Sequence, residues 1–532
     1  MAHKWTIRRG TLLDAAGGLR RADLAVADGR IAEIGPHLAP GENDLDASGL
    51  LVAPGFIDIH CHSEFSALVY PRAESRILAG VTTDVSGNCG ASPFPLVGEF
   101  KANRQAEWQP CGLALDWQSA AEYYALAESS PSSVNRALLA GHGALRAAVV
   151  GYADRPATPD ERLRMQRLLE DALDAGVFGL SSGLVYPPGC YADVDELADL
   201  AQVVAQAGGY YSSHIRSEGS RLLEAIDEFL EVLRRSGVRG QLSHLKAAGV
   251  RNWPKAREAV ARLRAARADG LAVTADRYPY LASMTDLDAM VLPNWAVEGG
   301  REQELARLTD PATRRRLAAE VRSAHPEPEW FDRIVVAAVS PGKPQDAAGR
   351  TLRQLGEAAG RDPLEVAFDL IVEHQTQVTA IHFSMSEENL RLILAEPYVA
   401  IGSDSSLRNL PGEADAAARA SLPHPRAYGT PVRFLATYVR DAGLMDWPEG
   451  IRRLTQLPAD VVGLTGRGRL APGAWADLVL FEKETLADRS TYECPWAAPD
   501  GIRHVFVNGE RVVADGQHTG ATPGRILRRE DP

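Results

Sequence analysis

Short apolar runs alternate with longer amphipathic stretches through the middle of this chain. The runs are rich in Val, Ile, Leu and Ala, as strands buried on both faces of a parallel sheet should be. They predict strands at residues 55–62, 81–89, 137–142, 177–183, 210–214, 240–246, 272–278 and 399–404. Between them, apolar residues at three- and four-residue spacing predict helices, for example at 159–175 and 219–237. The alternation predicts an α/β fold, a (β/α)8 TIM-like barrel.

The gap between the seventh and eighth predicted strands is far longer than one connecting helix needs. It predicts an insertion at about residues 283–395, within a barrel that spans 54–465. The stretches 311–324 and 352–373 inside this insertion have helical patterns. Because insertions near a barrel mouth often cover the substrate, this segment is a candidate for part of a binding site.

Both ends of the chain show a third pattern, of short strands joined by tight turns. Near the N-terminus, Asp28-Gly29 separates two strand-like segments, and near the C-terminus Asn508-Gly509 is a strong hairpin signal. We predict that the two ends together build one small β-sandwich, from residues 1–53 and 466–532.

Composition and charge exclude several classes of partner. The formal net charge of -13 is spread over 532 residues without a basic patch, which argues against nucleic acid or an anionic membrane. The N-terminus has no apolar signal region, and no apolar run approaches membrane-spanning length. The 5 cysteines form an odd and sparse set, better interpreted as reduced thiols than as a disulfide framework. These features favour a cytoplasmic protein.

Residues that can bind a metal or carry protons stand at the ends of several predicted strands. In a parallel barrel the C-terminal ends of the strands meet at one face, so residues far apart in sequence converge there. The residues at these positions are His60, His62, Cys89, His142, His214, His244 and Asp404. We therefore predict one polar site at that face.

His60 and His62 are two residues apart on a predicted strand, so both imidazoles can point at one ion. Such a pair alone is more often structural, but here it occurs with matching residues downstream. Cys89 lies between Gly87 and Gly90, where a turn can expose the thiol. A single cysteine is usually buried and inert, whereas a thiolate at neutral pH needs a metal or a cation nearby.

His214 and His244 end successive predicted strands and would face the same end of the barrel. Either histidine alone could be a hydrogen-bonded core residue, and together they favour metal ligation. Asp404 is the best candidate for a general base, because an aspartate beside zinc can take a proton from water and return it to a leaving amine. The alternative for Asp404 is a cap for the next helix, a common role at such turns.

Several motifs of this chain resemble those of the D-aminoacylases, the N-acyl-D-amino-acid deacylases of the metal-dependent amidohydrolase superfamily. The resemblance covers nearly the whole chain. The matching segments are Ala53 to Asp58, Gly80 to Thr83, Ser86 to Gly90, Gly141 to Arg146, Gly183 to Gly189, His214 to Glu218, Tyr278 to Tyr280, Gly402 to Asp404, Gly473 to Phe481, Val507 to Gly509 and Thr519 to Gly524. The resemblance implies hydrolysis of a small-molecule substrate, an N-acyl-D-amino acid, to a carboxylate and a free D-amino acid.

The resemblance also implies the metal ligands. One tight Zn2+ site would be formed by Cys89, His214 and His244. A second, weaker site would be formed by His60 and His62.

Further residues are implied to act on the substrate. Asp404 would be the catalytic acid and base, and His142 or a neighbouring backbone N–H would stabilise the developing oxyanion. A clamp for the substrate carboxylate maps onto Lys246, Tyr278 and Arg408. Lys246 could instead be a solvated or capping residue, and Arg408 a surface cation.

Two positions depart from the family pattern. His62 is followed by Ser63-Glu64, where many relatives have acidic pairs, and Arg277 stands where relatives usually have a small apolar residue. Because Arg277 and Tyr278 alternate on a predicted strand, both cannot face the barrel lumen.

The predicted fourth strand separates this chain from other branches of the superfamily. Hydantoinases, dihydroorotases and ureases use a carbamylated lysine there, and residues 177–183 contain no lysine. This favours linear amides over cyclic ones. Two alternatives stay open: another amidohydrolase reaction, on a cyclic amide or a dipeptide, and a non-catalytic amidohydrolase-like scaffold.

Overall fold

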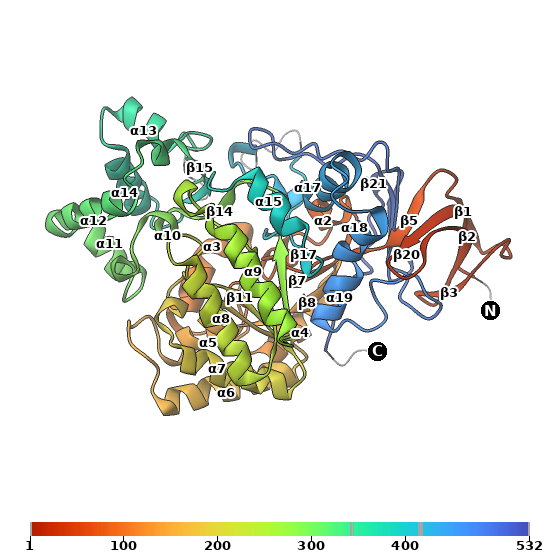
Figure 1. Cartoon of the computed structure of the whole chain (residues 1–532), viewed down its shortest axis with the longest axis horizontal. Helices are drawn as coiled ribbons and strands as arrows, with labels where there is room; N and C mark the ends of the chain where they lie inside the picture. Colours follow the sequence, from red (N-terminus) through yellow and green to blue (C-terminus); the bar gives the residue numbers. More distant parts are fainter. Residues whose placement is uncertain (1–2, 341–342, 344, 413–418, 530–532) are drawn as a thin grey trace.

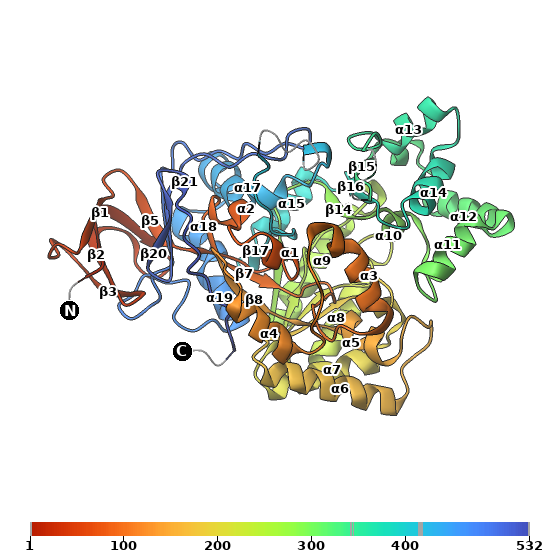
Figure 2. The ribbon, with the colours of Figure 1, turned by 180° about the vertical axis from the view of Figure 1, so that it is seen from behind.

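The computed structural model describes residues 3–340, 343, 345–412 and 419–529. Within these ranges, no helix is both long enough and apolar enough to cross a membrane. Along the longest axis of the molecule, a sheet formed by the two chain ends lies at one end. A group of helices from the middle of the chain lies at the other end (Figure 1, Figure 2).

Parallel strands form the centre of the fold, and each strand predicted from the apolar runs has a counterpart. Most are shorter than predicted, because the chain leaves the sheet before the polar residues at the strand ends. The strands are β6 (Phe56–Asp58), β7 (Val81–Ser86), β8 (Asn135–Leu138) continued by β9 (Ala140–Gly141), β10 (Gly179–Gly183), β11 (Tyr210–His214), β12 (Arg239–Leu242), β13 (Val273–Arg277) and β17 (Val399–Ile401). Neighbours in this order pair in parallel.

Backbone hydrogen bonds just beyond β17 join the last of these strands to the first. Asp404 N–H donates to His60 O at 2.7 Å, and His62 N–H donates to Ser405 O at 3.0 Å. The interior is filled by apolar side chains, which include Ile57, Ile59, Val85, Ala137, Leu139, Phe178, Tyr210 and Ala400. The architecture is therefore α/β, of the TIM-barrel type.

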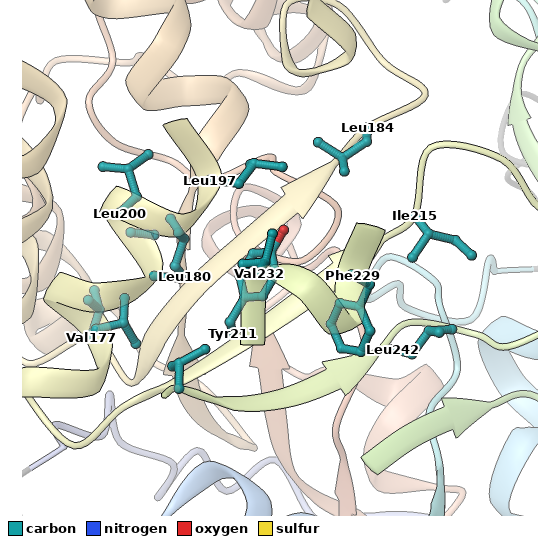
Figure 3. Packing of buried hydrophobic residues seen from close by; sticks show 14 of the residues in the cluster. Val177, Leu180, Leu184, Leu197, Leu200, Tyr211, Ile215, Phe229, Val232 and Leu242 are labelled. Carbon is teal, nitrogen blue, oxygen red and sulfur yellow. The ribbon is translucent and has the colours of Figure 1, made fainter. Parts of the chain in front are cut away.

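Helices follow the parallel strands and cover them. They are α1 (Ser66–Val69), α2 (Glu74–Ile77), α3 (Gly98–Trp108), α4 (Ala120–Ser129), α5 (His142–Val149), α6 (Pro159–Asp174), α7 (Val194–Gln206), α8 (Leu222–Ser236), α9 (Lys255–Ala268), α15 (Glu387–Leu394), α17 (Arg426–Arg433), α18 (Trp447–Leu454) and α19 (Gln456–Val462). The rings of Tyr211 in β11 and Phe229 in α8 stack with their centroids 6.0 Å apart. Figure 3 labels both residues among the packed side chains of this core. Helices α6 and α8 correspond to the predicted helices at 159–175 and 219–237.

Local sequence explains where these two helices begin or end. Thr158 caps α6 because its side chain accepts the N–H of Glu161, and the Glu161 side chain in turn accepts the N–H of Thr158. Helix α8 ends at Gly237, which has the left-handed φ of 70° that favours glycine.

One nine-stranded sheet contains strands from both ends of the chain. Its members are β1 (Trp5–Asp14), β2 (Gly18–Ala27), β3 (Arg30–Gly35), β4 (Asn43–Asp46), β5 (Leu51–Pro54), β18 (Leu478–Phe481), β19 (Ile502–Val507), β20 (Glu510–Ala514) and β21 (Gln517–His518). The antiparallel pair of β5 with β18 joins the two ends. The predicted hairpin is also present, since Asn508 and Gly509 turn β19 into β20 with φ values of 49° and 78°.

The segment between β13 and β17 contains a small antiparallel sheet that the apolar pattern does not predict. The strands of this sheet are β14 (Ser283–Asp286), β15 (Ile334–Ala338) and β16 (Thr379–His382). The helices of the same segment are α10 (Leu287–Val291), α11 (Arg301–Thr309), α12 (Pro311–Ala324), α13 (Leu352–Ala359) and α14 (Pro363–Glu373). Helix α12 matches the predicted range. The predicted stretch 352–373 divides into α13 and α14, because Gly360 takes a left-handed φ of 61° and Asp362 caps a new helix.

Candidate metal centre

Three strand-end side chains form one compact group of metal donors. His214 is the last residue of β11, His244 follows β12 by two residues, and Cys89 follows β7 by three. The Cys89 sulfur and one ring nitrogen of each histidine lie within 4.8 Å of one another. All three residues are buried, with exposed fractions of 8%, 7% and 2% for Cys89, His214 and His244. The structure therefore brings these three predicted ligands together.

A second group of donors shares Cys89 with the first and adds His60, His62 and Asp404. The Cys89 Sγ lies 3.3 Å from His60 Nε2. Asp404 Oδ1 lies 3.2 Å from His62 Nε2 and 3.6 Å from His60 Nε2. The His62 side chain is 27% exposed, whereas that of His60 is fully buried. Two neighbouring donor groups thus meet at one thiol.

Three of the donors have left-handed backbone conformations that residues other than glycine rarely adopt. The φ angle is 51° at Cys89, 35° at His244 and 52° at Asp404. Each such conformation costs about 1–3 kcal/mol, and such residues cluster at functional sites. Hydrogen bonds hold two of them, since Asp404 N–H donates to His60 O and His244 N–H donates to Asp276 Oδ1 at 2.9 Å. The fold therefore maintains a costly backbone geometry at the residues that form the donor groups.

Carboxylates behind the donors fix the orientation of two histidines. Both oxygens of Asp276 lie 3.1 Å from His60 Nδ1. Glu218 Oε1 lies 2.8 Å from His244 Nδ1. In metal sites a ligating histidine generally donates its second N–H to such a partner, which leaves the other nitrogen for the metal. In both rings here the other nitrogen, Nε2, faces Cys89.

The charges around the donors favour two anions. Burial alone would raise the pKa of the Cys89 thiol, but the charge of His60 and hydrogen bonds with the surrounding histidines hold it well below its usual value. Burial would likewise raise the pKa of Asp404, but the guanidinium of Arg426 and the nearby histidines hold it well below its usual range. Both pKa shifts favour the anionic forms of Cys89 and Asp404.

This set of donors fits zinc. Thiolate sulfur, imidazole nitrogen and carboxylate oxygen are the ligands that Zn2+ takes in proteins. His214 Nδ1 is buried and, in the part of the chain that the structure describes, has no hydrogen-bond partner. A buried nitrogen without a partner is costly unless it is satisfied, and a metal ion would satisfy it.

We expect Glu218→Gln to weaken zinc binding about 10- to 100-fold, because an amide orients His244 less firmly than a carboxylate. Competition with a chromogenic zinc chelator would measure the affinity. The matched control is Glu228→Gln, which removes a carboxylate that pairs with Arg216 at 2.8 Å rather than with a donor. Equal zinc affinities for the two variants would contradict the orienting role of Glu218.

The same substitution should alter the acid stability of the metal-free chain. Burial would raise the pKa of Glu218, but Lys246, His244 and His214 lower it below its ordinary value of 4.5. A lowered carboxylate pKa stabilises the fold above the ordinary value, and this contribution disappears as the pH falls below it. We expect the wild-type Tm to fall more steeply than that of Glu218→Gln between about pH 5 and pH 3, as followed by circular dichroism.

A cationic and aromatic group borders the donors. Lys246 Nζ lies 2.7 Å from His244 Nδ1 and 5.8 Å from the centre of the Tyr278 ring. The Tyr278 hydroxyl is buried and has no hydrogen-bond partner among the described residues. Arg426 is 4% exposed, its Nη1 lies 2.9 Å from Asp404 Oδ2, and its guanidinium lies 4.7 Å from the Tyr278 ring. Two cations and an unsatisfied phenol therefore stand beside the donors.

Arg426 is not identified from the sequence, and no described contact links Arg408 to the donors. Arg426 is the first residue of α17, so the strand-end argument does not identify it. The guanidinium of Arg408 lies 5.9 Å from the Trp496 ring, and none of its described contacts joins it to Lys246 or Tyr278.

His142 and Arg277 also make their described contacts away from the donors. His142 is fully buried at the start of α5, and its Nε2 lies 2.7 Å from Glu196 Oε1. The Arg277 guanidinium stacks 4.3 Å from the Tyr278 ring and donates to Tyr280 O at 2.9 Å. Arg277 therefore packs over the ring of Tyr278.

Comparison with known proteins gives consistent matches along the chain. The amidohydrolase family model matches residues 45–513. An N-acyl-D-glutamate deacylase of Alcaligenes xylosoxydans xylosoxydans is 37% identical over 529 residues, which cover 98% of this chain and 96% of that protein.

Two solved structures are similar over the same extent. One is N-acyl-D-glutamate deacylase from Bordetella bronchiseptica, complexed with zinc and a phosphonate inhibitor that mimics the tetrahedral intermediate. It is 33% identical with a TM-score of 0.82, covering 99% of this chain and 100% of that one. The other is a D-aminoacylase with a binuclear metal centre, in which one metal activates the enzyme and the second metal attenuates it. It is 30% identical with a TM-score of 0.81 and the same coverage.

Proposed function

Because this chain belongs to the amidohydrolase family, we propose that it hydrolyses the amide bond of N-acyl-D-amino acids to a carboxylate and a free D-amino acid. The observation that carries this proposal is the group of Cys89, His214 and His244 beside the carboxylate of Asp404. Relatives that are similar over almost their whole length act on substrates of this class. The substrate is accordingly a small molecule.

We propose that Cys89, His214 and His244 hold one Zn2+ tightly, and that His60 and His62 belong to a second, weaker site. The unequal effects of two metals in the similar D-aminoacylase support this difference. The exposure of His62 also supports it, since a more exposed ligand is less firmly oriented. When bound, zinc polarises the scissile carbonyl and lowers the pKa of a water molecule to about 7.

Asp404 carries the proton in this mechanism. Its carboxylate takes a proton from the attacking water and then returns it to the amide nitrogen as the C–N bond breaks. The oxygen of the water leaves in the released carboxylate, and the nitrogen leaves as the amine of the D-amino acid. Arg426, at 2.9 Å, keeps Asp404 ionised and fixes its orientation.

We propose that Lys246, Tyr278 and Arg426 hold the α-carboxylate of the substrate. Arg426 thus takes the carboxylate-binding role that the sequence predicts for Arg408. Two cations and a phenol with an unsatisfied hydroxyl supply the charge and the donors that a carboxylate needs. With the α-carboxylate fixed beside Asp404, the acyl amide of a D substrate would lie at the metal donors, whereas that of an L substrate would point away from them.

His142 is proposed as a positioning residue for the turn that holds Cys89. Its ring binds Glu196, and α5, which it begins, packs against the turn through Ala144 N–H, which donates to Gly90 O at 3.2 Å. The oxyanion would then be stabilised by a backbone N–H near this turn rather than by the imidazole.

We further propose that the domains follow the boundaries predicted from sequence. These are a β-sandwich formed by 1–53 and 466–532, and a barrel at 54–465 with an insertion at about 283–395. The continuous end sheet and the separate sheet of β14, β15 and β16 support this division. A cytoplasmic location is supported by the five cysteines, all of which are free thiols.

A substrate panel tests the proposal. We expect kcat/KM for the best N-acetyl-D-amino acid, among D-methionine, D-glutamate and D-aspartate, to exceed that of its L form by about 100-fold or more. Hydantoins and unmodified dipeptides should be hydrolysed far more slowly. A preference for either would support the alternative amidohydrolase reaction, and less than about 0.5 zinc per chain in protein purified without chelator would support a non-catalytic scaffold.

A further inference from the structure

Arg76 is a buried arginine that belongs neither to the donor groups nor to the proposed substrate clamp. It lies in α2 and is 1% exposed. Burying a guanidinium costs free energy unless opposite charges and hydrogen-bond acceptors surround it. The partners of Arg76 therefore indicate what this buried charge does for the molecule.

Two carboxylates of the barrel hold one side of the guanidinium. Arg76 Nε donates to Asp84 Oδ1 at 3.0 Å and lies 3.5 Å from Asp58 Oδ2. Asp58 belongs to β6 and Asp84 to β7, the first two strands of the barrel. Ser63 Oγ donates to Asp84 Oδ2 at 2.7 Å and helps to orient it. Because both carboxylates stand on strands, they fix the plane of the guanidinium relative to the barrel.

The other side of the guanidinium holds two backbone carbonyls from separate parts of the chain. Nη2 donates to Ser405 O at 2.6 Å, and Nη1 donates to Ala427 O at 3.0 Å. Ser405 directly follows Asp404, and Ala427 directly follows Arg426. One rigid group thus joins the backbone beside the proposed proton carrier to the backbone beside the proposed carboxylate clamp.

The neighbours of Arg76 on α2 bind the same loop beyond β17. Ser75 N–H donates to Arg408 O at 2.9 Å, and Leu410 N–H donates to Glu74 Oε2 at 2.8 Å. Helices α2 and α17 lie side by side (Figure 1, Figure 2). Three consecutive residues of α2 therefore hold the loop that carries Asp404, and Arg76 alone of the three also binds α17.

We propose that Arg76 is a positioning residue that sets the distance between Asp404 and Arg426. These two side chains pair at 2.9 Å, and Asp404 has a left-handed φ of 52°, which the surrounding structure must support. The planar fork of arginine holds two carbonyls at once, whereas the single ammonium of lysine cannot reach both while it stays with the carboxylates. This role rests on those proposed above for Asp404 and Arg426.

Arg76→Lys keeps the charge and loses the fork. We expect kcat to fall and KM to rise, so that kcat/KM for the best N-acetyl-D-amino acid drops about 100-fold, as a shift of about 1 Å in a reacting group produces. Zinc content should stay at the wild-type value, because the described contacts of Arg76 include none of Cys89, His214 and His244. Activity is expressed per bound zinc, which excludes unfolded chains from the comparison.

Arg453→Lys is the matched control. Arg453 is 2% exposed, pairs with Glu449 and donates to two backbone carbonyls, those of Glu396 and Val399. Val399 begins β17, whereas Asp404 follows the end of this strand. The control should lose stability as Arg76→Lys does, because both remove hydrogen bonds of a buried arginine. Its kcat/KM should stay within about 2-fold of the wild type.

A crystal structure of Arg76→Lys tests the role without an assay. We expect the Asp404–Arg426 pair to open from 2.9 Å to more than about 4 Å, beyond the range of an ion pair. An unchanged pair, or a kcat/KM equal to that of Arg453→Lys, would overturn the proposal. Failure of the wild type on every substrate of the panel would instead overturn the proposed function, and the distance would still decide whether Arg76 positions the two side chains.

Arg76→Met combined with Asp84→Asn covers the case in which the lysine variant does not fold. Replacing both members of a buried ion pair with neutral groups often costs little stability, whereas removing one member is strongly destabilising. The double variant lacks the donors to Ser405 O and Ala427 O, so it should show the same opened pair and the same loss of kcat/KM. If neither variant folds, Arg76 serves the fold alone and the proposal is wrong.

Discussion

Asp404→Asn is expected to lower kcat for the best N-acetyl-D-amino acid by about 10³-fold, within the range that general acid–base groups contribute. The amide keeps the size of the carboxylate, so the surrounding residues stay in place. However, it cannot take a proton from water at neutral pH. Because the first donor group consists of Cys89, His214 and His244, its zinc should remain bound. Release of the D-amino acid gives kcat, and mass spectrometry of the same samples gives zinc per chain.

Asp193→Asn is the matched control for this substitution. Asp193 caps α7 by accepting the N–H of Glu196, and asparagine caps a helix about as well as aspartate. This variant should therefore keep wild-type activity. If Asp404→Asn and wild type hydrolysed the substrate equally, the proposed mechanism would be wrong. If the variant lost the tight zinc together with its activity, Asp404 would be a ligand of that zinc. Asp404→Glu would then separate metal binding from proton transfer, because zinc content reports the first and the pH profile of kcat reports the second.

The parallel strands of this fold could be predicted from sequence because the apolar run and the strand coincide. The small sheet of β14, β15 and β16 could not be predicted in this way. Its antiparallel pairs join segments that are far apart in the chain, and most residues of β14 are half-exposed rather than buried. The break between α13 and α14 had a signal in the sequence. Gly360 followed by Asp362-Pro363 is the pattern of one helix ending and another beginning.

The donors of the site could be predicted because each stands at the end of a strand, where the barrel fixes its position. The residues around them follow no such rule. Arg408 and Arg426 both lie beyond the last strand, and only the path of the chain back to Tyr278 brings Arg426 to Asp404. Asp276 sits inside a strand, and its function as the partner of His60 depends on a contact across the barrel. The roles of residues that act through long-range contacts therefore could not be predicted from the sequence.

Cys89→Ala is expected to remove both bound zinc and activity, whereas His62→Ala should keep the tight zinc. Cys89 belongs to both donor groups, so its loss damages both at once. His62 belongs to the second group alone and is its most exposed histidine. We expect Cys89→Ala to hold less than about 0.1 zinc per chain after dialysis and to lose more than about 10³-fold in kcat/KM. His62→Ala should retain about one zinc and change activity by less than about 10-fold.

Cys190→Ala controls for the loss of a buried thiol. Cys190 is 7% exposed and belongs to neither donor group, so this variant should match the wild type in zinc and activity. Wild type stripped by a chelator should behave like Cys89→Ala and recover with one equivalent of zinc, because its three donors are intact, whereas Cys89→Ala should not recover. A Cys89→Ala variant that holds as much zinc as Cys190→Ala would place the tight site elsewhere. Such a result would also remove the thiolate from the mechanism, because Cys89 is the single residue through which the two donor groups meet.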